Sequence, residues 1–201
     1  MTPAKTSHPA FFDDGLYTGV SHLTQHVPAV VNSAVSLWTD FGLGVFALLM
    51  IVGWWRARKA RRPVLPVYAV PVVVVLSYVA DDLLKSLVDE QRPCRILHVA
   101  TVQACPPMGD WSFPSNHATI AAAATVALLM IDRRVGLLAV PVALLMAASR
   151  VWVGAHYPHD VLAGLAIGSV LAAVLTRLTL LAQSRLTPRQ PVPSTSGART
   201  P

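Results

Sequence analysis

The chain has 201 residues, of which 54% are hydrophobic and only 13% charged, whereas an ordinary soluble domain is about 25% charged. This composition, with a mean hydropathy of +0.53, excludes a disordered chain, a nucleic-acid-binding arm and a disulfide-dense secreted module, because each needs much less apolar surface or many more cysteines. The net charge is +6, but the placement of the basic residues along the chain is more informative than their sum.

Residues 1–37 lack the basic start, apolar stretch and small-residue cleavage site of a signal peptide. Apolar side chains nevertheless recur there at three- and four-residue spacing, at Phe12, Leu16, Val20, Leu23, Val27 and Val30. This periodicity predicts an amphipathic helix lying in the membrane interface. The alternative is a loosely ordered lead-in.

Residues 38–186 contain apolar stretches of the length that a membrane crossing needs, roughly 17 to 25 residues for a hydrocarbon core about 30 Å thick. The predicted spans are residues 38–55, 64–85, 115–131, 135–151 and 160–181. The third is long enough to cross the membrane only if it begins at the polar residues 114–116. We therefore expect an all-α, polytopic membrane helical bundle of about five transmembrane helices, preceded by the interfacial helix.

Most basic residues fall where they share one side of the membrane if the apolar stretches span it. Eleven of the sixteen do so: Arg56, Arg58, Lys59, Arg61, Arg62, Arg133, Arg134, Arg177, Arg185, Arg189 and Arg199. By the positive-inside rule that side is cytoplasmic, so residues 86–116 and 152–159 are expected on the outer face of a bacterial cell membrane. Residues 187–201, rich in Pro, Ser and Thr, predict a disordered cytoplasmic tail.

The second predicted span ends in the charged residues Asp81, Asp82 and Lys85, and Arg92-Pro93 follows. Charge at membrane depth is costly and indicates function by default. Lysine offers a compact charge and arginine a planar fork suited to phosphate oxygens. Two bland alternatives remain open: an Asp81–Lys85 pair whose charges neutralise each other, and cations that snorkel to the membrane surface.

The third predicted span begins with Pro114-Ser115-Asn116-His117. Ser115 or Asn116 can cap this helix, whose free amides form a site for an anion. His117 then lies beside that anion. The alternative is a plain helix cap with an interfacial histidine.

Ser149-Arg150 ends the fourth span, and His156 and Asp160 follow with four-residue spacing. The turn at Tyr157-Pro158 can bring the Asp160 carboxylate to one imidazole nitrogen, which leaves the other nitrogen free as a nucleophile. His159 is expected to face water or lipid headgroups.

These three blocks supply three cations, a serine, a helix N-terminus and two histidines, a set suited to phosphoryl transfer without a metal. His156 is expected to attack phosphorus and His117 to protonate the departing oxygen. Metal motifs such as H-E-x-x-H are missing from the sequence, and the excess of cations repels a divalent ion. The sequence therefore predicts no metal and no other cofactor.

The blocks resemble, in order and internal spacing, the three signature motifs of the type 2 phosphatidic acid phosphatase (PAP2) family. They read Lys85-x6-Arg92-Pro93, Pro114-Ser115-Asn116-His117 and Ser149-Arg150-x5-His156-x3-Asp160. One departure is Asn116, where the family most often has glycine, which adopts positive φ more easily.

The resemblance implies a role for each matched residue. Phosphate is held by Lys85, Arg92, Ser115, Arg150 and the backbone of Asn116. His117 is the general acid, His156 the nucleophile and Asp160 its orienting partner.

Within the family, the short chain and the motif sequences look most like the bacitracin-resistance type of undecaprenyl-diphosphate phosphatase. Such an enzyme removes the terminal phosphate of a polyprenyl diphosphate in the membrane and regenerates the monophosphate carrier used in cell-wall building. Hydrolysis of phosphatidate or phosphatidylglycerophosphate is an alternative activity. A transporter or scaffold in which Asp81, Asp82 and Lys85 relay protons or hold helices together is an alternative of another class.

The two cysteines, Cys94 and Cys105, both lie in the 86–116 loop. An oxidising exterior permits a disulfide there, and two free thiols are the alternative.

Overall fold

The computed structural model describes residues 12–61 and 65–186, and within them it has eight helices and no strand. The helices are α1 (Asp14–His26), α2 (Ala29–Phe41), α3 (Leu43–Lys59), α4 (Leu65–Val88), α5 (Pro93–Ile96), α6 (Asn116–Ile131), α7 (Arg133–Trp152) and α8 (Pro158–Leu186). The predicted all-α class is confirmed. The predicted tail and the first eleven residues of the predicted lead-in lie outside the described residues.

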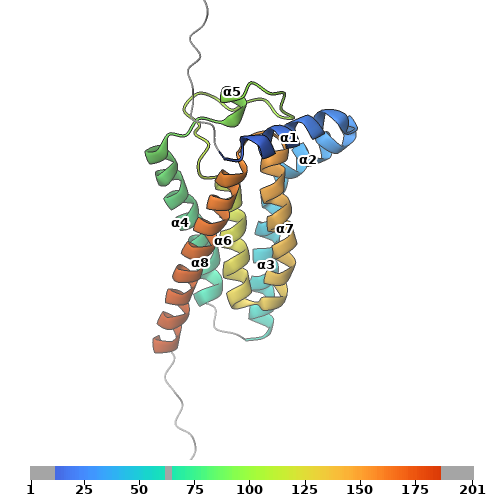
Figure 1. The fold of residues 1–201 in the computed structure, drawn as a ribbon. Coiled ribbons are helices and arrows are strands. Elements are labelled where there is room, and N and C mark those ends of the chain that lie inside the picture. Colours follow the sequence, from blue (N-terminus) through green and yellow to red (C-terminus); the bar gives the residue numbers. More distant parts are fainter. Residues whose placement is uncertain (1–11, 62–64, 187–201) are drawn as a thin grey trace, which may run out of the picture.

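Five helices form a bundle with α6 at its centre, where it contacts α3, α4, α7 and α8 (Figure 1). Small side chains on α6, among them Ala118, Ala121 and Ala124, are fully buried and allow the neighbouring backbones to approach closely. At Gly168 of α8, an added Cβ would overlap the carbonyl oxygen of Thr119. The α6–α8 contact therefore requires glycine at this position.

The bundle helices correspond to the five predicted spans, although not all pass the same test of length and apolarity. Among the described helices, α4, α7 and α8 are each long and apolar enough to cross a membrane, and α2 and α3 pass only as a pair bent by 50°. Helix α6 is apolar but shorter, at 16 residues. It is also the most covered of the bundle helices, since α3, α4, α7 and α8 all pack against it.

The lead-in forms two helices where the sequence pattern indicated one, and the break lies at Val27-Pro28. Both helices lie across one end of the bundle (Figure 1). On α1 the buried residues are Tyr17, Ser21 and Thr24, whereas Leu16 and Leu23 are exposed. Polar and aromatic groups thus face the protein and apolar groups face outward, the arrangement expected of a helix that lies in lipid.

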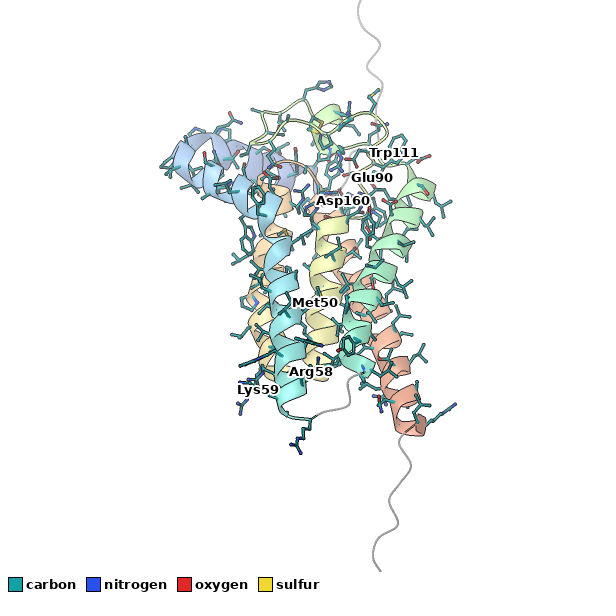
Figure 2. The ribbon with its side chains drawn as sticks, turned by 180° about the vertical axis from the view of Figure 1, so that it is seen from behind. Met50, Arg58, Lys59, Glu90, Trp111 and Asp160 are labelled. Atoms are coloured by element: carbon teal, nitrogen blue, oxygen red, sulfur yellow. A yellow bond between two sulfur atoms is a disulfide. The ribbon has the colours of Figure 1, made fainter. Side chains whose placement is uncertain are left out.

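The two ends of the bundle differ in chemistry (Figure 2). Arg58 and Lys59 mark one end, here called the basic end, which also contains the α6–α7 connection at Asp132. Glu90, Trp111 and Asp160 mark the opposite end, here called the loop end, formed by residues 89–115 and 153–157.

Candidate active site

Lys85 and Asp81 are both buried near the loop end of α4. The carboxylate of Asp81 accepts a hydrogen bond from the hydroxyl of Thr119 on α6, at 2.6 Å. The same hydroxyl lies 3.0 Å from the carbonyl oxygen of Gly164 on α8. Asp81 therefore ties the three helices together instead of serving only to neutralise Lys85.

Arg92 is buried, and three of its guanidinium contacts fix its orientation. Nε and Nη2 donate to Asp110, to the carbonyl oxygen at 2.8 Å and to the carboxylate at 2.7 Å. Nη1 donates to the carbonyl oxygen of Ala155 at 2.7 Å and lies 3.3 Å from Nε2 of His156. The sequence motif did not reveal Asp110, which comes from a loop without regular structure.

His156 and Asp160 meet as their spacing predicts. Nδ1 of His156 lies 3.3 Å from Oδ2 of Asp160, and both residues are buried. The same oxygen accepts hydrogen bonds from the hydroxyl of Ser112 and, at 2.8 Å, from the main-chain N–H of Tyr157. Because the carboxylate is fixed by these donors, it holds the imidazole with Nε2 directed toward Arg92.

The turn before His156 depends on Gly154, which has a φ of +85°, a conformation that favours glycine. Tyr17 of α1 donates a hydrogen bond to the carbonyl oxygen of Gly154 at 2.9 Å. The N-terminal helix is thereby attached to the loop that carries the candidate nucleophile.

Ser115 occupies the cap position of α6, but its side chain does not cap the helix. Its hydroxyl is buried and has no hydrogen-bond partner among the described residues. Its main-chain N–H donates to the carbonyl oxygen of Asp160 at 3.1 Å, which joins the second sequence block to the third. The side chain of Asn116 points elsewhere and donates to Asp82 at 3.4 Å.

Arg150 reaches the same region from the end of α7. Its Nη1 donates to Thr39 of α2 at 3.0 Å, and the Thr39 and Ser149 hydroxyls lie 2.9 Å apart. His117 lies in the first turn of α6 and is half-buried. Hydrogen bonds join Arg92 of the first block to His156, and Ser115 of the second block to Asp160, so all three blocks meet at the loop end.

Burial lowers the pKa of His156 to about 3; the hydrogen bond with Asp160 opposes this shift, and the positive charges of Arg92 and Arg150 reinforce it. The imidazole is therefore neutral at neutral pH. A neutral imidazole whose Nδ1–H is held by a carboxylate has its lone pair on Nε2, which is the form that can attack phosphorus.

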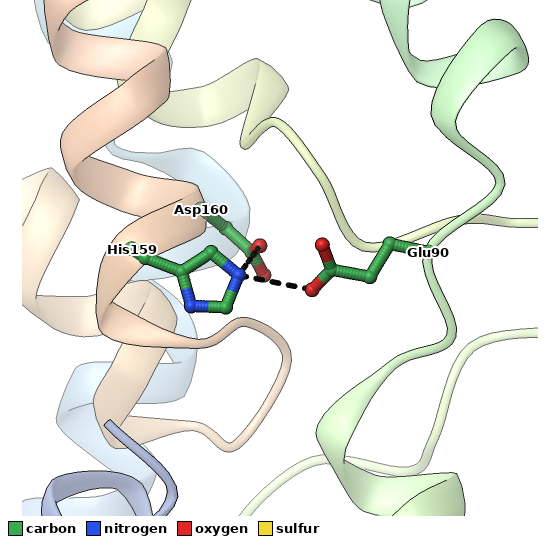
Figure 3. Close-up of side chains that lie close together, drawn as sticks. All are labelled: Glu90, His159 and Asp160. Atoms are coloured by element: carbon green, nitrogen blue, oxygen red, sulfur yellow. Dashed lines mark hydrogen bonds and ion pairs between the residues drawn. The ribbon is translucent and has the colours of Figure 1, made fainter. Parts of the chain in front are cut away.

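His159 is not directed to water or headgroups, and that expectation is wrong. Its Nδ1 lies 2.9 Å from Asp13. Its Nε2 lies 3.0 Å from Glu90 and 3.2 Å from Asp160 (Figure 3). Nothing in the sequence indicated that the start of α1 and the 89–115 loop fold back over α8, and these segments supply Asp13 and Glu90.

The ligand atoms of Glu90, His159 and Asp160 lie within 4.8 Å of one another, close enough to surround a metal ion. Nδ1 of His159 faces Asp13, and Nε2 faces both Glu90 and Asp160. When both nitrogens carry a proton, the cluster is an ion-pair network that links α1, the 89–115 loop and α8.

Cys94 and Cys105 are joined by a disulfide, with their Cα atoms 5.9 Å apart. Arg95 lies within this closed segment and donates a hydrogen bond to the carbonyl oxygen of Pro106. The disulfide thus closes the part of the loop between Arg92 and its partner Asp110.

A family model described as the PAP2 superfamily matches residues 66–183, a range that includes all eight predicted site residues. The chain belongs to the PAP2 superfamily. A curated relative is the undecaprenyl-diphosphatase BcrC of Bacillus subtilis (strain 168), which is 31% identical over 159 residues covering 79% of this chain and 80% of the relative.

Two solved structures have a similar fold. Aquifex aeolicus LpxE superimposes with a TM-score of 0.66 at 20% identity, covering 84% of this chain and 97% of that chain. The transmembrane PAP2-type phosphatidylglycerolphosphate phosphatase of Bacillus subtilis superimposes with a TM-score of 0.61 at 20% identity, covering 88% of each. These likenesses show that the bundle is the fold of PAP2 membrane proteins.

Proposed function

We propose that this protein hydrolyses undecaprenyl diphosphate to the monophosphate and phosphate, without a metal, through a phosphohistidine intermediate. The observation that carries the proposal is the geometry of His156, with Nδ1 3.3 Å from Asp160 and Nε2 3.3 Å from the fixed guanidinium of Arg92. The likeness to an undecaprenyl-diphosphatase over most of both chains supports the choice of substrate.

The reaction takes place in two displacements. Nε2 of His156 attacks the terminal phosphorus, the bond from phosphorus to the bridging oxygen breaks, and His117 gives a proton to that departing oxygen. Water then attacks the phosphohistidine and gives a proton to the now deprotonated His117, the P–N bond breaks, and phosphate leaves with both histidines restored. Lys85, Arg92, Arg150, Ser115 and the amides at the start of α6 stabilise the charge on the equatorial oxygens.

The site is proposed to face the outside of a bacterial cell membrane. The basic end, with Arg56, Arg58 and Lys59 in the last turn of α3, supports a cytoplasmic location for that end. The loop end then meets substrate at the outer surface, where the disulfide between Cys94 and Cys105 is stable.

A substrate panel tests this function. Phosphate release by the purified protein in detergent, with chelator present, is compared for undecaprenyl diphosphate, phosphatidate and phosphatidylglycerophosphate. We expect a clear preference for the diphosphate and no loss on chelation. Preference for a monoester contradicts the substrate, chelator sensitivity contradicts the metal-free mechanism, and hydrolysis of none of them favours the transporter or scaffold.

A further inference from the structure

An apolar groove of about 550 Å³ lies between α2 and the last turns of α7, at the end of the bundle where α2 crosses (Figure 1). Its walls are formed by Val31, Ala34 and Trp38 of α2 and by Leu145, Ala148 and Trp152 of α7. The volume lies within the range of roughly 300 to 1,000 Å³ typical of small-molecule sites.

The groove adjoins the candidate phosphate site, with the buried hydroxyls of Ser149 and Thr39 between it and Arg150. Ser149 lines the groove, and its hydroxyl lies 2.9 Å from that of Thr39, which accepts the hydrogen bond from Arg150. One residue along α7 therefore separates an apolar wall from a guanidinium in the cationic pocket.

Two buried donors at this junction have no hydrogen-bond partner among the described residues. One is Nε of Arg150, a residue more than nine-tenths buried, and the other is the indole Nε1 of Trp38, a residue that lines the groove. A buried donor without a partner costs free energy unless a ligand accepts its hydrogen bond. The oxygens of a diphosphate can accept from these donors, whereas an isoprenoid chain carries no acceptor, so the two donors indicate where the head of the substrate lies and not its chain. The indole of Trp152, by contrast, is held by Asn32 at 3.0 Å, which fixes one wall of the groove.

We propose that this groove binds the isoprenoid chain of the substrate next to its diphosphate. The proposal rests on the proposed function and adds the place where the lipid part is recognised. A phosphate held by Arg150 carries a chain that must leave the polar pocket, and the groove offers an apolar path that starts at Ser149. Bending of the α2–α3 pair by 50° places α2 across α7, so α2 forms part of the substrate site.

The test fills the groove from both sides. Ala34 and Ala148 line it and are exposed, so Ala34→Trp and Ala148→Trp place a large ring in the groove without disturbing buried neighbours. Leu37→Trp and Leu144→Trp are matched controls, because these leucines lie on the same helices, are exposed and do not line the groove.

For each purified variant, kcat/KM is measured with undecaprenyl diphosphate and with the five-carbon isopentenyl diphosphate at a fixed detergent concentration. We expect the ratio of the two values to fall by about tenfold in the groove variants and to stay at the wild-type value in the controls. Activity toward the short substrate shows in each case that the variant is folded.

An unchanged ratio in the groove variants overturns the proposal and means that ordinary bilayer lipid covers the groove. An equal fall in kcat/KM toward both substrates also overturns it, because the substitutions then disturb the fold and not the binding of the isoprenoid chain. If the wild-type protein hydrolyses neither diphosphate, the proposed function fails, which is a different result from an active enzyme whose chain-length preference does not respond to the groove.

Discussion

Helices α6 and α7 begin at opposite ends of the bundle, and the residues before them use their side chains differently. At the basic end, Oδ1 of Asp132 accepts hydrogen bonds from the main-chain N–H groups of Arg134 and Val135, at 3.1 and 3.4 Å. Its Oδ2 pairs with Arg56 at 2.9 Å. At the loop end, the hydroxyl of Ser115 is buried and caps nothing.

We infer from this difference that Asp132 stabilises the fold, whereas Ser115 is available to a ligand. Burial raises the pKa of Asp132, but hydrogen bonds from Arg56 and from the amides of Val135 and Arg134 outweigh this and hold it below its ordinary value. Asp132 is thus satisfied within the protein. The hydroxyl of Ser115 is buried and makes no hydrogen bond among the described residues, which is the state expected of a group that contacts a bound anion.

The largest expected effect comes from removing the candidate nucleophile. His156→Gln keeps a polar side chain but cannot form the phosphohistidine, so kcat should fall by about 10⁴-fold. The measurement is phosphate release, together with capture of protein-bound label from substrate labelled in its terminal phosphate. His22→Gln, at an exposed position of α1, is the control, and full activity in His156→Gln contradicts the mechanism.

The next largest effect is expected at Ser115, the residue before α6. Ser115→Ala removes a hydroxyl that makes no hydrogen bond within the described protein, so stability should change little while kcat/KM falls by about 10²-fold. Ser86→Ala, at an exposed position of α4, controls for the loss of a hydroxyl. A Ser115→Ala variant that is fully active but unstable would show that Ser115 stabilises the fold and does not contact the substrate.

The pH dependence of unfolding should show the burial of His156. Because its pKa is lowered to about 3 in the folded protein, against about 6.5 when unfolded, the unfolded state binds more protons between these values. Stability is therefore complete above the unfolded pKa and is lost as pH falls. This one group should cost about 1.4 kcal/mol between pH 7.5 and 5.5. The measurement is the difference between wild type and His156→Gln, and equal pH slopes would refute it.

The smallest expected effect lies at the basic end. Asp132→Ala removes the cap of α7 and should cost about 1 kcal/mol of stability, with kcat/KM unchanged because Asp132 is far from the loop end. Asp132→Asn retains a capping oxygen and should cost less. The midpoint of unfolding in detergent and the rate of phosphate release are measured on the same samples. A loss of activity without a loss of stability would contradict the structural role of Asp132.

The sequence by itself determined the helical bundle and indicated the candidate site. Long apolar stretches cannot leave backbone groups unpaired in lipid, so they must be helices, and charged residues at membrane depth indicate function by default. The spacing of His156 and Asp160 predicted their contact within one short segment, and the motif order indicated the PAP2 family before any geometry was known.

Only the tertiary structure decided which partners complete those residues. The partners come from loops or from distant helices: Asp110 contacts Arg92, Ser112 donates to Asp160, and Thr39 accepts from Arg150. The same holds for His159, which Asp13 and Glu90 surround from two other parts of the chain. Local periodicity constrains one helix at a time, whereas these contacts depend on how α1, α2 and the 89–115 loop return over the end of the bundle.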